Sequence, residues 1–200
     1  MLKVRVIPTL LWKDTTLVKG VGFDSWRRVG SMLPAIKVYN TRQVDELIIV
    51  DITATRDNRE PDYESVEEYS SECFVPLTIG GGVKNINDVK NLLQAGADKI
   101  SINSTAMDTP EIISEIAGKF GSQCVVVSID ARLCTNGRYE CFSHSGTKST
   151  GRDAVEWARE AVDRGAGEIL LTSIDRDGTM EGYDIDLIRS ITEAVSIPVI

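Results

Sequence analysis

The chain has 200 residues, of which 42% are apolar, and its formal net charge is −8 at pH 7. This length and apolar content allow one sizeable hydrophobic core, so we expect a single domain over residues 1–200. An isoelectric point of about 4.8 argues against a nucleic-acid-binding surface, which needs clustered lysine and arginine. An anionic small molecule is still permitted, because glycine loops and helix N-termini bind phosphate without a net positive charge.

No window approaches the roughly 18 uninterrupted apolar residues of a membrane span, and the N-terminus enters a strand-like run without a signal-peptide pattern. We therefore expect a cytoplasmic protein, and nothing in the sequence indicates a cofactor or a metal. A metal or disulfide pair at the two cysteines around Asn136-Gly137 is left open. We expect all four cysteines, none of which forms a CxxC pair, to be reduced: Cys73, Cys124, Cys134 and Cys141.

Short β-branched and apolar runs recur along the chain and predict seven strands. Several are apolar throughout, which is typical of strands buried on both faces of a parallel sheet. In chain order the predicted strands span residues 4–10, 46–51, 75–79, 99–102, 124–129, 168–173 and 197–200.

Amphipathic segments between these runs predict about six helices. The helix expected over residues 85–95 opens with an asparagine, and the one over residues 109–119 has Pro110 in its first turn. Similar helices are expected over residues 152–163 and 183–194. This alternation predicts βαβ units, and it fits an α/β fold of the (β/α)8 barrel type that lacks its last one and a half βα units, about 50 residues. A doubly wound sheet is the alternative.

An internal repeat favours the barrel. Residues 46–48 recur as 168–170, and residues 75–77 recur as 197–199, both at an offset of 122. A common offset indicates a duplicated half-barrel. It also predicts a second glycine loop just beyond Ile200.

Glycines at one predicted strand end could hold a phosphate. Gly80-Gly81-Gly82 follows a strand and precedes a helix start, where the backbone can approach an anion and unpaired N–H groups point at it. An ordinary strand-to-helix turn is the alternative. Asn103-Ser104 ends the next strand and could complete the same pocket.

Carboxylates close three other predicted strands, where barrels of this kind keep their active sites. Asp51 and Asp130 end their strands, and residues 175–179 (DRDGT) follow the strand 168–173. A carboxylate in such a place can act as a general acid or base if its surroundings tune its pKa. A solvated turn is the alternative for residues 175–179, and Asp51 could equally be an anchor that accepts hydrogen bonds from nearby backbone.

Charged residues also stand at the opposite, starting ends of the strands: Arg5, Glu46, Lys99 and Glu168. Two acids and two bases would then meet at the barrel floor. Buried charge is costly unless it is paired, so alternating signs are the economical arrangement. Such a ring is either a structural plug or a gate for a small polar molecule.

Seven segments together match a known family. They are 18–20 (VKG), 51–54 (DITA), 80–82 (GGG), 99–103 (KISIN), 120–123 (FGSQ), 125–130 (VVVSID) and 165–179 (GAGEILLTSIDRDGT). In these segments the chain resembles the cyclase subunit of imidazole glycerol phosphate synthase. The likeness extends over essentially the whole chain.

This resemblance implies a ribulose-phosphate-binding barrel and a lyase that uses ammonia from a separate glutaminase docked on the barrel floor. It implies that the ammonia gate consists of Arg5, Glu46, Lys99 and Glu168. The implied catalytic residues are Asp130, Lys19 of the first loop, and Asp51. The implied phosphate- and substrate-binding residues are Gly81, Gly82, Asn103, Ser104, Thr172, Asp177 and Gly178.

The chain departs from the cyclase pattern at the end of its first strand. Leu11 occupies the position of the second catalytic aspartate, and leucine cannot transfer a proton. Asp14 lies three residues further on, and Thr147 replaces a usual lysine. The altered strand is similar to that of amidation-associated paralogues encoded with surface-polysaccharide genes (the WbuZ type).

In those paralogues, resemblance implies that the ammonia pathway is kept and that the acceptor is a sugar-linked substrate, which gains an acetamidino group. Three alternatives are kept: a true cyclase that uses another acid or base, a non-catalytic activator of the glutaminase, and the related histidine-pathway isomerase. The missing carboxylate counts against the isomerase as well as the cyclase, because both reactions need an acid and a base.

Overall fold

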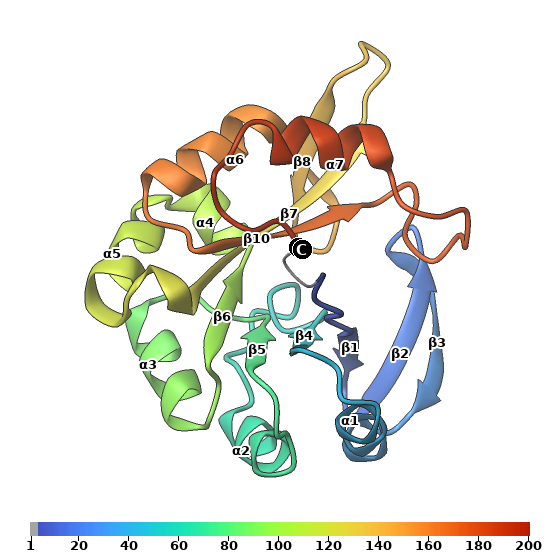
Figure 1. Cartoon of the computed structure of the whole chain (residues 1–200), viewed down its shortest axis with the longest axis vertical. Coiled ribbons are helices and arrows are strands. Elements are labelled where there is room, and N and C mark those ends of the chain that lie inside the picture. Colours follow the sequence, from blue (N-terminus) through green and yellow to red (C-terminus); the bar gives the residue numbers. More distant parts are fainter. Residues whose placement is uncertain (1–3) are drawn as a thin grey trace. The chain divides into compact units, whose positions relative to one another are not determined.

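The computed structural model describes residues 4–200, and the chain divides into two compact units. The first unit contains the chain up to Lys19 together with Arg27–Ile100, and the second contains Gly20–Trp26 and Ser101–Ile200. Each unit is built from parallel strands followed by helices (Figure 1). The single domain expected from the sequence stays a prediction.

Parallel strands form the centre of the first unit. The strands β1 (Thr9–Lys13), β4 (Leu47–Asp51) and β5 (Leu77–Gly80) pair in this order and run parallel. β6 (Lys99–Ile102) comes next to β5, and β2 (Thr16–Val21) returns antiparallel to β1. The side chains of Leu47, Ile48 and Ile49 are fully buried, as expected for a strand covered on both faces.

Helices α1 (Met32–Thr41), α2 (Tyr63–Ser71) and α3 (Ile86–Gln94) lie in a row along one side of these strands (Figure 1). The predicted start of α3 is confirmed, because the Asn85 side chain accepts hydrogen bonds from the backbone N–H groups of Asn87 and Asp88. Such a cap satisfies donors that have no partner inside the helix. The strand β3 (Asp24–Gly30) completes a hairpin with β2.

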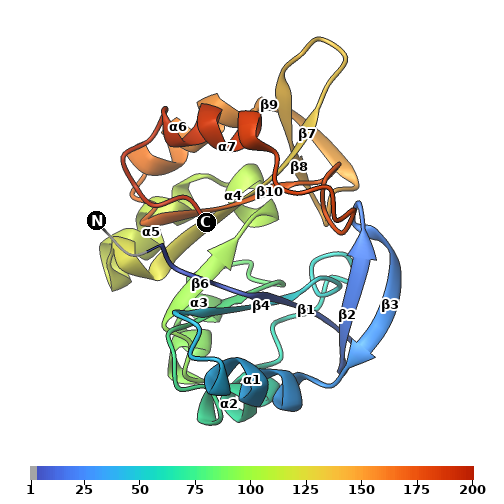
Figure 2. The same ribbon diagram turned by 45° about the vertical axis from the view of Figure 1, so that its right-hand side comes forward.

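In the second unit β7 (Val125–Leu133) lies between β10 (Glu168–Ser173), which is parallel to it, and β8 (Tyr139–Ser143), which is antiparallel. β9 (Lys148–Asp153) pairs antiparallel with β8. Figure 2 shows β7 and β8 continuing as a hairpin beyond the helices of this unit. The hairpin carries the chain away from Asp130 and back to the same strand end.

Helices connect the strands of the second unit. They are α4 (Ser104–Asp108), α5 (Glu111–Phe120), the 3-10 helix η1 (Ser122–Cys124), α6 (Ala154–Asp163) and α7 (Ile185–Thr192). α5 and α6 pack against β7, and α7 packs against α6. Trp157 of α6 is 1% exposed and anchors this part of the core.

Three predicted strands are wrong in their extent, one of them because β7 continues to Leu133, past the predicted end at residue 129. The first begins at Thr9 instead of residue 4, because Pro8 has no N–H to donate to a ladder and Val6 is largely exposed. The segment 197–200 forms only an isolated parallel bridge between Val199 and Ile169. The hairpins β2–β3 and β8–β9 were not predicted, because their residues are largely polar and lack an apolar run.

The internal repeat recurs in the backbone hydrogen bonds. Leu47 N–H donates to the Pro76 carbonyl at 3.0 Å, and Ile169 N–H donates to the Pro198 carbonyl, also at 3.0 Å. Leu47 lies opposite Leu77, as Ile169 lies opposite Val199. Donors, acceptors and partners are each 122 residues apart. The two units therefore carry the same strand register, as a duplicated half-barrel requires.

Candidate active site

Asp130 on β7 is the centre of the candidate site. It is 9% exposed and lies between Thr172 on β10 and Phe142 on β8. Its carboxylate accepts hydrogen bonds from Asn103 Nδ2 at 2.9 Å and from Ser128 Oγ at 3.4 Å. Burial raises the pKa of Asp130 to about 7, against a smaller opposing effect of the Ser128 bond. A carboxyl group with this pKa can give or take a proton near neutral pH.

Asn103 and Ser104 are tied to the turn that follows β8. Asn103 Nδ2 also donates to the Phe142 carbonyl at 3.3 Å, and Ser104 Oγ accepts from the His144 N–H at 2.9 Å. Asn103 Oδ1 is buried and has no hydrogen-bond partner within residues 4–200. A buried acceptor of this kind is costly unless a ligand or water supplies a donor. The structure thus brings the predicted Asn103, Ser104 and Asp130 together.

Asp177 and Gly178 lie in the turn after β10. Gly178 has φ +72°, and a Cβ there would lie within 3.0 Å of the Gly20 carbonyl oxygen, so only glycine fits. The Gly22 N–H donates to the Asp177 carbonyl at 2.9 Å, which fastens the turn to the first loop. Burial raises the pKa of Asp177, and its Oδ2 has no partner in the described part of the chain.

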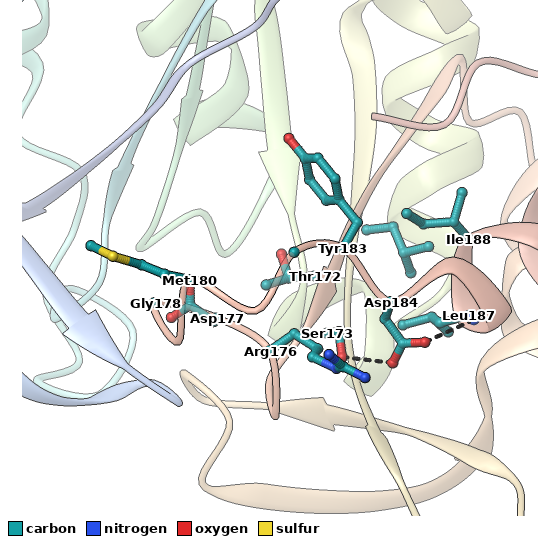
Figure 3. Close-up of a pocket in the computed structure, with 12 residues that line it drawn as sticks. Thr172, Ser173, Arg176, Asp177, Gly178, Met180, Tyr183, Asp184, Leu187 and Ile188 are labelled. Carbon is teal, nitrogen blue, oxygen red and sulfur yellow. Dashed lines mark hydrogen bonds between the residues drawn. The ribbon is translucent and has the colours of Figure 1, made fainter.

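A cavity of about 310 Å³ opens beside this turn (Figure 3). Thr172 and Asp177 line it, and the Asp184 carboxylate on its wall accepts hydrogen bonds from Ser173 Oγ at 3.0 Å and Tyr139 Oη at 2.8 Å. Burial and the contact with Asp184 raise the pKa of Tyr139 to about 12, so this hydroxyl remains a donor. The predicted Thr172, Asp177 and Gly178 therefore share one pocket wall.

In the first unit the loop after β4 packs on the glycine turn. Gly81 and Gly82 have φ +102° and +73°, and a Cβ on Gly81 would lie within 3.0 Å of the Asp51 carbonyl oxygen. The Gly82 N–H donates to Thr55 Oγ1 at 3.3 Å. These glycines are needed for a close backbone approach, and their role in phosphate binding stays a prediction.

Asp51 is occupied by its own loop. Its Oδ1 accepts from Thr53 N–H at 2.9 Å and Ala54 N–H at 3.0 Å, and its Oδ2 forms an ion pair with Arg59 at 3.2 Å. These bonds match the anchoring role that the sequence left open. A catalytic role of Asp51 remains untested, as does that of Lys19, which is exposed on β2.

Leu11 and Asp130 hold equivalent positions in the two units. Leu11 lies opposite Val50 in the β1–β4 pair, and Asp130 lies opposite Thr172 in the β7–β10 pair. Val50 and Thr172 are 122 residues apart, as in the repeat. The first unit thus carries an apolar pair where the second carries a carboxylate and a hydroxyl.

Arg5, Glu46 and Lys99 of the predicted gate are joined in one ion cluster. The Glu46 carboxylate, whose residue is 7% exposed, binds the Arg5 guanidinium with one oxygen and Lys99 Nζ with the other, at 2.7 Å. Arg5 precedes β1, Glu46 precedes β4 and Lys99 starts β6, so all three lie at strand starts. Glu168 is buried at the start of β10, at the position that repeats Glu46.

His144 is one residue that the sequence did not point to. It lies in the β8–β9 turn and is bound to Ser104 through its backbone. The sequence did contain one signal that could have identified His144: it is the sole histidine of the chain. Asp184 of the cavity wall and its hydrogen-bond donor Tyr139 were also missed, because no motif joins residues 45 positions apart.

Within residues 4–200, no helix combines the length and apolar character that a bilayer crossing needs. The described residues also contain no group of three or more histidine, cysteine or acidic side chains placed to hold a metal ion.

Parallel strands followed by helices, with buried carboxylates at the strand ends, are the arrangement of (β/α) barrels, in which active sites lie at the carboxyl ends of the strands. The sequence profile of a family described as "Histidine biosynthesis protein" matches residues 5–200. The chain belongs to this family, whose members are barrel enzymes of histidine biosynthesis. The expected α/β barrel fold and the resemblance to the cyclase type are thereby confirmed at the level of the family.

Proposed function

We propose that the chain is the synthase subunit of a glutamine amidotransferase. In this proposal a separate glutaminase subunit supplies ammonia, and the chain adds it to a phosphorylated or nucleotide-linked sugar. The product carries an acetamidino group and serves surface-polysaccharide synthesis. The observation that carries the proposal is the buried Glu46 carboxylate, which binds both Arg5 and Lys99.

A purely structural role explains this cluster poorly. Desolvating an ion costs several kcal/mol, and apolar side chains of similar volume often stabilise a protein as well or better. Glu46 nevertheless holds two cations from two other segments of the unit. Ammonia and ammonium are small, polar and able to exchange hydrogen bonds with such groups, so a polar inlet fits this arrangement.

Exposed apolar side chains lie at the same strand ends. Val4 and Val6, which precede β1, are 85% and 61% exposed, and Phe74, which precedes β5, is 80% exposed. Exposed apolar side chains at the strand starts can contribute to a protein contact. They support docking of a protein partner over the inlet, which is where the proposal puts the glutaminase.

The acceptor is inferred from Leu11. A true cyclase would need a second carboxylate at this position, and the strand register puts a leucine at the site equivalent to Asp130. This favours an acceptor other than the ribonucleotide substrate of the cyclase. The cyclase alternative makes a direct prediction: that substrate and an ammonium salt should give an imidazole product.

The Lys99→Met variant tests the inlet. It keeps the aliphatic stem but removes the cation bound to Glu46, so glutamine-dependent amination in the complex with the glutaminase is expected to fall about tenfold or more, a barrier change of roughly 1.4 kcal/mol. Amination from ammonium salt is expected to fall less. The measurement is product formation from each nitrogen source.

Lys37→Met is the matched control, because Lys37 pairs with Glu72 in a largely exposed position. If Lys99→Met supports both nitrogen sources as well as wild type does, the inlet proposal is wrong. If docking of this chain enhances glutamine hydrolysis but no acceptor is aminated, the chain is a non-catalytic activator. Such a role would not need the carboxylate that Leu11 replaces.

A further inference from the structure

We propose that His144 is the second proton-transfer group of the Asp130 site and supplies the function that Leu11 cannot. This inference rests on the proposed amination reaction and names a residue for it. His144 is the single histidine of the chain and the first residue after β8. Imidazole is the side chain that most often transfers protons in enzymes.

Two hydrogen bonds, joined by the peptide bond between Asn103 and Ser104, link the backbone of His144 to the Asp130 carboxyl. The His144 N–H donates to Ser104 Oγ at 2.9 Å, and the adjoining Asn103 donates through Nδ2 to Asp130 Oδ2 at 2.9 Å. The same Nδ2 donates to the carbonyl of Phe142, two residues before His144. The end of β8 is therefore fixed to the strand end that carries the catalytic carboxyl.

The backbone at His144 is strained. His144 and Ser145 have φ +53° and +56°, a conformation that costs a non-glycine residue about 1–2 kcal/mol. The turn is held by Thr147 Oγ1, which donates to the His144 carbonyl at 2.7 Å, and by Gly146, where a Cβ would lie 2.8 Å from the Phe23 ring. Strain that its surroundings maintain in this way is concentrated at functional sites.

The imidazole is oriented by the neighbouring hydroxyl of Ser143. Its Nδ1 lies 3.0 Å from the hydroxyl of Ser143, which is 1% exposed. A hydrogen bond at one ring nitrogen determines whether the other nitrogen carries a proton. The same unit also holds two unpartnered buried acceptors, Asn103 Oδ1 and Asp177 Oδ2, which suit the N–H groups of ammonia or an amine.

Two groups can carry the reaction through a closed proton cycle. When ammonia attacks a carbonyl carbon, the C–N bond forms, the Asp130 carboxylate takes one proton from nitrogen, and the His144 imidazolium gives one to oxygen. In the second step Asp130 returns its proton to the hydroxyl, which leaves as water. The imidazole takes a proton from nitrogen as the C=N bond forms, and both residues are restored.

The His144→Gly variant tests this role, because glycine adopts a positive φ without cost and the turn should keep its shape. With ammonium salt and a nucleoside-diphosphate N-acetyl sugar as probe, kcat is expected to fall about 10²–10⁴-fold and KM to stay within about twofold. Free imidazole should restore part of the rate. Ser145→Gly, which relieves the same backbone strain, should behave like wild type.

Unchanged turnover in His144→Gly, or failure of imidazole to rescue it, would overturn the proposal. A second measurement does not depend on turnover. The single imidazole signal in the NMR spectrum should move in Asp130→Asn and stay in place in Asp163→Asn, which alters an exposed helix end. An unmoved signal in Asp130→Asn would separate His144 from the site. If wild type aminates no acceptor, the proposed function fails, and this signal alone decides whether His144 belongs to the Asp130 site.

Discussion

Asp130→Asn is expected to lower product formation by about 10²–10⁴-fold and, at the same time, to make the folded protein more stable above pH 7. Asparagine keeps the size of the side chain but cannot exchange a proton. The stability gain arises because a buried carboxylate is penalised. Burial raises the pKa of Asp130 to about 7 in the folded chain, whereas an unfolded aspartate titrates near 4.

The sign of the pH effect follows from proton binding. Between about pH 4 and 7 the folded state holds a proton on Asp130 that the unfolded state has lost, so wild-type stability falls as the pH rises through this window. Above pH 7 both states are ionised and the penalty is constant, on the order of a few kcal/mol. The stability advantage of Asp130→Asn should thus grow from pH 4 to 7 and then level off.

Chemical denaturation at pH 5, 6, 7 and 8 measures this effect, and a parallel rate profile should lose its inflection near pH 7. Asp163→Asn, at the exposed end of α6, is the control and should change neither quantity. An Asp130→Asn variant that is equally active, or less stable than wild type at pH 8, would contradict the assignment of Asp130.

Gly81→Ala should destabilise the protein by about 2–5 kcal/mol, which lowers the melting temperature by roughly 4–20 °C for a chain of this size. Two effects add. The residue has φ +102°, which alanine rarely adopts, and the new Cβ would lie within 3.0 Å of the Asp51 carbonyl oxygen. Because the obstacle is backbone, it cannot move aside as a flexible side chain would.

Gly118→Ala is the matched control for this substitution. Gly118 lies in α5, and a Cβ there would have no atom within 4 Å, so alanine should stabilise the helix by about 0.5–1 kcal/mol. Thermal unfolding of the two variants therefore should shift in opposite directions. Equal melting temperatures would show that the loop after β4 does not pack on the glycine turn as described.

The buried strands were predictable because a short, continuous apolar run has to be buried, and the centre of a parallel sheet buries both of its faces. Residues 46–51, 99–102 and 168–173 were found nearly to the residue. The hairpins of β2–β3 and β8–β9 were not, because their strands are short, partly exposed and rich in polar residues such as Arg27 and Ser149. Their pairing is set by turns with positive φ, which single-sequence patterns do not reveal.

The residues of the candidate site were predictable where they directly follow a strand. A strand end is visible in the sequence, and Asp130 and Asn103 are indeed joined by a hydrogen bond. The engagement of Asp51 with Arg59 was not predictable, because it depends on how the loop between β4 and α2 folds back. The proximity of His144 to Ser104 likewise arises from a hairpin whose length the sequence did not disclose.

The shared register of the two units has an evolutionary consequence. Each copy repeats the hydrogen bond from a strand start to a proline carbonyl, although one has leucine and the other aspartate at the equivalent strand position, so this register does not require the carboxylate. The two copies can therefore diverge in sequence: one copy can keep its proton-transfer residue while the other has a hydrophobic side chain at the equivalent position. At residue 11 the first copy has a hydrophobic side chain, and its strands keep the shared register.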